Sequence, residues 1–380
     1  FFKSGGAGNV LRSIAEGMRV LGIEVSHSTK IASTLREEPL RSPHDLLAGI
    51  VDNYAIRRSD WPSLFSLSRN SVSATSLIDT SVDIHVLRWP IGIVGLEGNV
   101  FGEKPVVWGL PDMHPFTGGC HYSGTCNQFT QRCENCPAVR GFSKRSVEEA
   151  LKRKYELYAS IPNLTFVSPT RWMHGQVEIS ALPQFARVAH VPNPVPRAYL
   201  ENQIERHYKE GRRIRVGFVA ANVEDPLKGY NQIRKQIQSL VEEGLVDFYV
   251  VGKASKKFLQ ENPFATVLGK RSRQEMVSVY DNLDVIVVPS LQENVGGVVP
   301  EAQARGVPAI VSSAGGLPEQ VQNGGGWQVS KNSNFAKFLH GLDWTEIESQ
   351  SELGKKRALG LSPEKIAEKT LALAAESLAD

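Results

Sequence analysis

The sequence has few cysteines, no long apolar run and almost no surplus of charge. Its 380 residues include only four cysteines, and no apolar run approaches the roughly 20 residues of a membrane-spanning helix. The 43 basic and 40 acidic residues leave a formal net charge of +3, which is too balanced to indicate nucleic-acid binding. No signal peptide is visible, so we expect a cytoplasmic protein, with a peripheral membrane contact left open. The chain begins with Phe1 rather than Met, so a targeting segment could have preceded it.

Strand-like and helix-like segments alternate along both halves of the chain. In the first half, strands are predicted at residues 24–28, 83–87, 104–108, 164–167 and 187–191. In the second half, strands are predicted at residues 213–221, 246–251, 265–268, 284–288 and 307–311. Helices are predicted between them, at residues 9–21, 147–160, 230–243, 274–282 and 300–305, and at the end, at 363–378. Such alternation is typical of α/β domains with parallel sheets.

A cluster of proline and asparagine at residues 192–194 interrupts the alternation, which restarts after it. We therefore place one Rossmann-like domain at residues 1–193 and a second at 194–362. Ser146 and Glu149 have the spacing of a capping box, which predicts the start of the helix at 147–160. Gly5 and Gly6 precede the helix at 9–21, an arrangement typical of a phosphate-binding turn; a simple glycine turn is the alternative.

Residues 289–321 carry the most informative pattern in the chain. Glu293 and Glu301 are separated by seven residues, and Gly296 and Gly297 lie between them. Buried strands are predicted on either side, so the first carboxylate follows a strand and the second opens a helix. Ligands of open α/β sheets bind at the carboxyl ends of strands and against helix N-termini. Glycines there permit close approach to an anionic group, and carboxylates suit paired hydroxyls such as those of a ribose and a sugar.

This segment resembles the E-x7-E signature of retaining nucleotide-sugar glycosyltransferases of family 4, which have the GT-B fold. The residues after it, Ala-x-x-x-Gly-x-Pro and then Gly-Gly-Leu-Pro-Glu at 315–319, extend the resemblance. The resemblance implies two Rossmann-like domains with parallel sheets facing across a cleft, and a last helix, 363–380, that crosses back to the first domain. It implies transfer of a sugar from a UDP- or GDP-sugar to a hydroxyl of a glycan or lipid-linked acceptor, with no cofactor required for catalysis.

The resemblance also assigns roles to individual residues. Lys228, in a Lys-Gly pair after the strand at 213–221, would contact the diphosphate, Glu293 the transferred sugar, and Glu301 the ribose. The full set of expected donor-binding residues is Gly5, Gly6, Asn222, Lys228, Glu293, Asn294, Val295, Gly296, Gly297 and Glu301. The family often has an arginine before the lysine, but here Asn222 and Glu224 occupy that region. Arg271 or Arg273 is a candidate for the missing second cation.

A second distinctive segment spans residues 108–137 and resembles family 4 enzymes of bacterial exopolysaccharide assembly, the colanic-acid type. Asp112 follows a predicted strand and could bind the acceptor hydroxyl or act as its base; a turn cap is the alternative. We therefore expect Asp112, Lys228 and Glu293 to carry the chemistry. Two family histidines are replaced, by Pro111 and by Arg88, which leaves the sugar undefined. His114 and His121 lie nearby and are either replacements or structural residues.

All four cysteines, Cys120, Cys126, Cys133 and Cys136, fall in this second segment, in an insertion at about 112–140. Their spacing is C-x5-C-x6-C-x2-C, and the Cys-x-x-Cys half suits a tetrahedral thiolate site. In a reducing cytoplasm a structural zinc is favoured over two disulfides. Free thiols are the third alternative.

Other functions of the same fold stay open. A non-catalytic or divergent nucleotide-sugar-binding protein is favoured only by the two replaced histidines. A nucleotide-sugar epimerase or hydrolase is disfavoured by the E-x7-E context. The sequence does not indicate the nucleotide base, the sugar or the acceptor.

Overall fold

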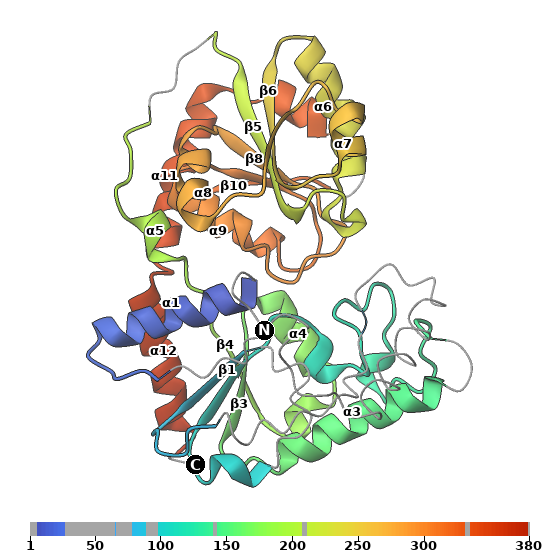
Figure 1. The fold of residues 1–380 in the computed structure, drawn as a ribbon, viewed down its shortest axis with the longest axis vertical. Coiled ribbons are helices and arrows are strands. Elements are labelled where there is room, and N and C mark those ends of the chain that lie inside the picture. Colours follow the sequence, from blue (N-terminus) through green and yellow to red (C-terminus); the bar gives the residue numbers. More distant parts are fainter. Residues whose placement is uncertain are drawn as a thin grey trace. The chain divides into compact units, whose positions relative to one another are not determined.

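The computed structural model describes residues 6–26, 65, 78–88, 98–139, 143–206, 211–330 and 335–378 (Figure 1). The chain divides into two compact units. The first comprises Phe1–Pro192 together with Ile366–Asp380, and the second comprises Asn193–Lys365. Within the described ranges, no helix is both long enough and apolar enough to cross a membrane.

The first unit contains a parallel sheet of four strands in the order β1-β2-β3-β4. The strands are β1 (His85–Arg88), β2 (Val106–Gly109), β3 (Leu164–Ser168) and β4 (Arg187–His190). The two central strands, β2 and β3, consist of buried residues throughout, as the apolar runs of the sequence predict. Each of the four strands coincides with a predicted one. The strand predicted at 24–28 is not seen at residues 24–26, and residues 27–28 lie outside the described ranges.

The helices of this unit are α1 (Gly6–Val20), α3 (Ser143–Ala159), α4 (Arg171–Glu178) and most of α12 (Pro363–Glu376). Thr170 caps α4, because its side chain accepts a hydrogen bond from the amide of Met173. The predicted capping box at the start of α3 is wrong. The helix begins at Ser143, so Ser146 lies inside it, and Glu149 pairs instead with Arg145 one turn earlier.

The second unit contains a parallel sheet of six strands in the order β10-β9-β8-β5-β6-β7. The strands are β5 (Ile214–Asn222), β6 (Val246–Lys253), β7 (Thr266–Gly269), β8 (Val285–Val288), β9 (Ala309–Val311) and β10 (Gly326–Gln328). The chain runs outward from β5 to β7, then returns to the centre at β8 and runs outward the other way. Strands β5 and β8 are therefore neighbours at the point where the winding direction changes, which is the usual ligand site of doubly wound sheets.

Helices surround this sheet, as Figure 1 shows. They are α5 (Arg197–Leu200), α6 (Tyr230–Glu242), α7 (Lys256–Glu261), α8 (Arg273–Asp281), α9 (Val298–Ala304), α10 (Phe335–His340) and α11 (Trp344–Leu359). Two clusters of buried apolar residues fill the space between helices and sheet. One includes Ile233 and Ile237 of α6, and the other includes Tyr280 of α8 and Val299 of α9.

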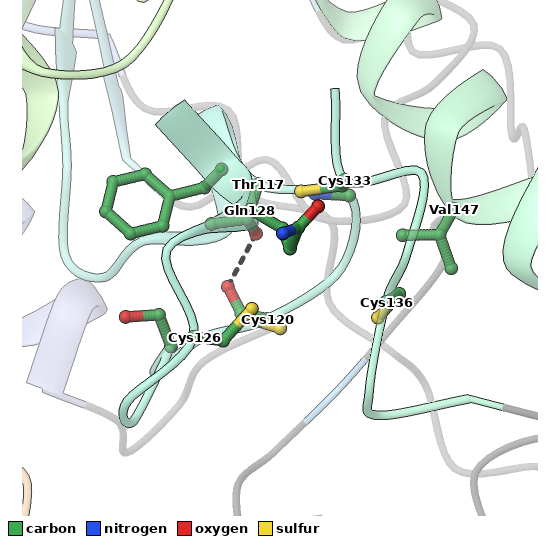
Figure 2. A pocket seen from close by; sticks show the side chains of 10 residues that line it. Thr117, Cys120, Cys126, Gln128, Cys133, Cys136 and Val147 are labelled. Carbon is green, nitrogen blue, oxygen red and sulfur yellow. Dashed lines mark hydrogen bonds between the residues drawn. The ribbon is translucent and has the colours of Figure 1, made fainter. Parts of the chain in front are cut away.

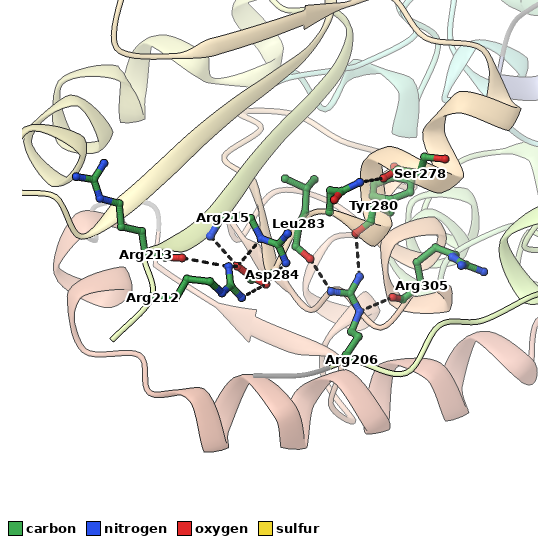
Figure 3. A network of polar contacts seen from close by, with 10 residues as sticks. Arg206, Arg212, Arg213, Arg215, Ser278, Tyr280, Leu283, Asp284 and Arg305 are labelled. Atoms are coloured by element: carbon green, nitrogen blue, oxygen red, sulfur yellow. Dashed lines mark hydrogen bonds and ion pairs between the residues drawn. The ribbon is translucent and has the colours of Figure 1, made fainter. Parts of the chain in front are cut away.

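Asp284, which immediately precedes β8, joins the beginnings of β5 and β8 (Figure 3). Its carboxylate is 1% exposed and accepts hydrogen bonds from the guanidinium groups of Arg212, at 2.8 and 2.9 Å, and Arg215, at 3.0 and 3.2 Å. The amide of Arg215 donates a further bond at 2.8 Å. Burial alone would raise the pKa of Asp284, but these bonds outweigh it and lower the pKa. This network fixes the register of the two central strands.

Candidate functional site

The candidate site of the second unit lies at the carboxyl ends of β5 and β8. Lys228 follows β5, and Glu293 follows β8. The Lys228 ammonium donates a hydrogen bond of 2.7 Å to the Glu293 carboxylate. The side chains are 28% and 11% exposed, so the ion pair is only partly shielded from solvent. Two residues that the sequence separates by 65 positions thus meet at the edge of the sheet where the winding direction changes.

Gly229 explains why Lys228 lies so near to β8. Its φ of +75° belongs to the left-handed region, and a Cβ placed on it would lie 1.9 Å from the carbonyl oxygen of Pro289. Only glycine permits this contact between the end of β5 and the end of β8. The amide of Leu291 also donates to the carbonyl of Leu227 at 2.8 Å. The Lys-Gly pair therefore has a structural basis. Gly229 permits the close backbone contact with Pro289, and this contact places Lys228 beside Glu293.

The loop between Glu293 and α9 also depends on a glycine. Gly296 has a φ of +71°, and a Cβ there would lie 2.4 Å from Leu317 Cδ2. The amide of Gly316 donates to the carbonyl of Glu293 at 3.1 Å, which joins the Gly-Gly-Leu-Pro-Glu segment to the first glutamate. Gly297 precedes α9, and its Cα faces open space. Asn294 is buried and Val295 is half-buried in the same loop.

Glu301 lies in the first turn of α9, where the phenol of Tyr280 donates to its carboxylate at 3.3 Å. Burial of the carboxyl group raises the pKa of Glu301 to about 7, against the opposing effects of the Arg273 charge and the Tyr280 hydrogen bond. The Nη2 atom of Arg273 is buried and has no hydrogen-bond partner among the described residues. No sequence pattern indicated a role for Tyr280. The sequence also did not distinguish Arg273 from Arg271 as the candidate for the second cation.

Asn222 and Glu224 occupy the region where an arginine was expected, and the structure shows what they do. Asn222 is exposed at the end of β5, and its side-chain oxygen accepts a bond from the amide of Glu224. Glu224 accepts two bonds from Ser255, at 2.8 and 2.9 Å, and so joins the loop after β5 to the start of α7. Glu224 therefore has a structural role.

In the first unit, Asp112 lies beyond the carboxyl end of β2 and is 9% exposed. One carboxylate oxygen accepts a bond from the amide of His114 at 2.9 Å, and the other lies 2.7 Å from Nδ1 of His121. The rings of His114 and His121 are stacked, with centroids 4.9 Å apart. The two histidines singled out by position thus form one buried cluster with Asp112. Asp112 is both a turn-forming residue and a partner that orients an imidazole.

The ammonium of Lys154, on α3, completes the buried cluster. It is 8% exposed and donates to the carbonyls of His114, at 2.7 Å, and Thr117, at 2.9 Å. Burial lowers the pKa of Lys154 to about 7, although nearby acidic groups act in the opposite direction. Lys154 was not predicted as a site residue, because a lysine on an amphipathic helix is expected to face water.

The two replaced positions, Arg88 and Pro111, lie at the end of β1 and just after its neighbour β2. Arg88 ends β1, and burial lowers the pKa of its guanidinium to about 10. A Cβ placed on Gly109, at the end of β2, would lie 2.7 Å from Arg88 Nε. The arginine therefore packs over a strand end that only a glycine leaves open. Gly6 begins α1 and is exposed, whereas Gly5 lies outside the described residues.

The four cysteines line one pocket and are free thiols (Figure 2). Cys120, Cys133 and Cys136 are buried, and Cys126 is half-buried. A hydrogen bond from Cys120 lowers the pKa of the Cys136 thiol to about 7, although burial opposes this. In the part of the chain that the structure describes, no three cysteine, histidine, aspartate or glutamate side chains form a ready-made metal site. Zinc at these cysteines stays a prediction.

Comparison with solved structures shows the GT-B glycosyltransferase fold. Sucrose-phosphate synthase from Thermosynechococcus elongatus aligns with a TM-score of 0.63 and 14% identity, over 99% of this chain and 94% of that one. A glycosyltransferase from Rickettsia africae aligns with a TM-score of 0.59 and 14% identity, over 100% and 97%. HepE from Anabaena, solved in complex with UDP, aligns with a TM-score of 0.52 and 13% identity, over 80% and 79%. At these identities the likeness concerns the fold alone.

Residues 213–342, within the second unit, match the family model "Glycosyl transferases group 1". Among curated proteins, D-inositol 3-phosphate glycosyltransferase of Mycobacterium sp. (strain KMS) is 36% identical over 78 residues, which are 20% of this chain and 18% of that protein. The enzyme of the same name from Corynebacterium diphtheriae is 47% identical over 57 residues, which are 15% and 13%. The chain thus matches less than a fifth of the length of these relatives.

Proposed function

We propose that the protein is a retaining glycosyltransferase that moves a sugar from a UDP- or GDP-sugar to a hydroxyl of a glycan or lipid-linked acceptor, in bacterial polysaccharide synthesis. The observation that carries the proposal is the Lys228–Glu293 pair at the switch point between β5 and β8. It lies within the segment that matches the group 1 glycosyl transferases.

The pair supplies the two groups that a sugar donor requires. When the bond between sugar and diphosphate breaks, negative charge develops on the diphosphate, and the Lys228 ammonium stabilises it without a metal. The Glu293 carboxylate accepts hydrogen bonds from hydroxyls of the transferred sugar. In the absence of donor the two groups neutralise each other at 2.7 Å, which holds both side chains in one place. The donor site is therefore preorganised.

Arg273 is our candidate for the second cation of the donor site. Arg271 is paired with Glu275 at 3.2 Å, whereas the buried Nη2 atom of Arg273 has no partner among the described residues. The charge of Arg273 also acts on Glu301, the predicted ribose ligand. An arginine at this position compensates for the one that Asn222 and Glu224 replace.

The acceptor side of the proposal rests on Asp112 and His121. An imidazole held through Nδ1 by a carboxylate is the usual arrangement of an oriented base or hydrogen-bond donor. We assign Asp112 to the positioning of His121 at the end of β2, and leave the acceptor's proton to His121 or to the departing phosphate.

Calorimetric titration with UDP-glucose, GDP-mannose and their free nucleotides, followed by measurement of donor turnover with and without an acceptor mixture, tests the proposal. We expect binding of one nucleotide family, and turnover that increases with acceptor. The anomeric configuration of the product, read by NMR, tests retention. Failure of both nucleotide families to bind would overturn the donor site.

A non-catalytic nucleotide-sugar-binding protein is the second candidate, favoured by the replacement of two family histidines by Pro111 and Arg88. It predicts donor binding with neither transfer nor hydrolysis. The same two measurements distinguish it from the enzyme.

A further inference from the structure

The segment from residue 110 to residue 139 has little regular structure to hold it. It connects β2 to α3 and contains only two short 3-10 turns, at His114–Phe116 and Gln128–Thr130. Loops of this length without secondary structure are uncommon in compact domains. Three of its cysteines nevertheless lie in the apolar core of the first unit, together with Phe116 and Phe129. Something other than a backbone ladder must hold this segment in one conformation.

The four cysteines of this segment surround one cavity. Cys120, Cys126, Cys133 and Cys136 line the same small pocket, together with Thr117, whose hydroxyl donates to the carbonyl of Cys120 (Figure 2). The thiols of Cys120 and Cys136 are already in hydrogen-bond contact. A tetrahedral tetrathiolate site requires all four sulfurs to lie about 2.3 Å from one zinc ion.

Backbone amides point at three of the four sulfurs. The amide of Gly118 donates to Cys133 Sγ at 3.4 Å. The amides of Ala138 and Val139 point at the sulfur of Cys136, two and three residues before them. The amide of Gln128 points at the sulfur of Cys126 in the same way. Such N–H···S bonds favour sulfur that carries negative charge, and outer-sphere hydrogen bonds of this kind orient metal ligands.

Two further features fit a charged centre. Cys133 has a φ of +56°, which is uncommon for a residue with a side chain, and it begins the Cys-x-x-Cys turn. The buried Lys154 side chain lies beside the cysteines, because it donates to the carbonyl of Thr117, whose hydroxyl donates to the carbonyl of Cys120. Four thiolates around Zn²⁺ carry a net charge of −2, which a buried cation offsets in part.

We propose that these four cysteines bind one structural zinc ion, which fixes the segment from 110 to 139 onto the first unit. The thiols as they stand are not drawn together around one point. Binding would therefore turn them inward from the walls of their pocket, with release of the thiol protons. With four protein ligands the ion has no open position, so it has no part in sugar transfer. The proposal is independent of the proposed function.

The test is metal analysis of the full chain, purified without chelator from cells grown with zinc. We expect about one zinc per chain, a fall in melting temperature after treatment with a strong chelator, and recovery when zinc is added back. Replacement by Co²⁺ should give the absorption bands of a tetrahedral thiolate complex. Cys136→Ser should lose the zinc, and circular dichroism shows whether that variant still folds.

Ser123→Ala is the matched control, because Ser123 lines the same pocket without a sulfur. It should keep the full zinc content. Thiol counting in denaturant separates the other outcomes. Zinc-free protein with four reactive thiols, or with fewer than four because disulfides have formed, would overturn the proposal. Both results leave donor binding by the second unit untouched.

Discussion

In the proposed donor site, the side chains of Lys228 and Glu301 carry charge in different ways. Lys228 is held by a partly exposed ion pair, so its charge is available for exchange from Glu293 to an incoming phosphate. Glu301 is half-buried, and burial of its carboxyl group raises its pKa. With a pKa of about 7, Glu301 is divided between two protonation states at neutral pH.

Lys228→Ala should weaken binding of the nucleotide-sugar about 10- to 100-fold, because a hydrogen bond to a charged group contributes about 1.5–3 kcal/mol. Calorimetric titration measures the loss. Lys256→Ala is the control, since that lysine is exposed on α7 of the same unit. Equal affinity in the two variants would contradict the diphosphate role of Lys228.

Glu301 should make donor affinity depend on pH. With a pKa of about 7, its carboxyl is about 10% ionised at pH 6 and about 90% at pH 8, so affinity should rise about tenfold over that range if the ionised form accepts the ribose hydroxyls. Glu301→Gln should bind weakly and without this pH dependence. Glu348→Gln, at an exposed position of α11, should behave as the unchanged protein. A rise that survives in Glu301→Gln would show that another group titrates.

The same carboxyl also affects folding stability. Because folding raises the pKa of Glu301, the folded state binds its proton more tightly than the unfolded state does. Its stabilising contribution is complete below the unfolded pKa of about 4.3 and is lost as pH rises toward about 7. Urea titrations of the protein and of Glu301→Gln should converge at low pH and separate above it.

At the scale of elements, the proposed donor site depends on how closely the ends of β5 and β8 approach. Gly229→Ala should cost about 2–5 kcal/mol, the sum of a left-handed backbone penalty and an overpacking penalty against Pro289. Gly244→Ala is a matched control, because Gly244 has almost the same φ, +74°, but its Cβ would meet nothing nearer than 3.5 Å. It should cost only about 1–2 kcal/mol. Chemical denaturation measures both, and equal losses would mean that the Pro289 contact is unimportant.

Asp284 holds together the amino-terminal ends of the same two strands, β5 and β8. Asp284→Ala should destabilise the protein by about 3 kcal/mol, because it leaves Arg212 and Arg215 without their shared partner. Asp247→Ala, which removes an exposed pair with Arg213 at 3.3 Å, should cost about 0–1 kcal/mol. Since the pKa of Asp284 is lowered, its contribution is present above the unfolded pKa of about 3.9 and is lost as pH falls below it. The two variants should therefore become alike in strong acid.

At the scale of the whole molecule, the two units have separate apolar cores that share no residue. Differential scanning calorimetry should therefore resolve two unfolding transitions. A saturating nucleotide, at about 100 times its dissociation constant, should stabilise the second unit by about 2.7 kcal/mol and raise one transition. A zinc chelator should lower the other. A single transition moved by both ligands would contradict independent units.

Most strands and helices of both units could be predicted from the sequence, because buried parallel strands are apolar runs and their boundaries carry glycine or proline. The strand β10 and the helices α5, α7, α10 and α11 were missed, and of α4 only the N-terminus, at residues 168–170, was predicted. Helix α11 shows the reason. Its buried positions, Ile347, Ser351, Gly354 and Ala358, include small and polar residues, since the helix lies against α9 at close range. A Cβ on Gly354 would lie 3.2 Å from Gln303 Cγ. Because close packing requires small residues at these positions, α11 lacks the apolar periodicity from which a helix is predicted.

By itself, the sequence determined the alternation of strands and helices, the two glutamates around a glycine pair and the clustering of four cysteines, because these are local patterns. Only the tertiary structure decided which distant groups meet. The order of the strands places Lys228 against Glu293, the turn after β2 brings Asp112 to His121, and the start of α8 places the charge of Arg273 near Glu301. Lys228 and Glu293 are 65 positions apart, and Asp112 and His121, nine positions apart, meet only through the path of an irregular loop, so no local spacing encodes these contacts.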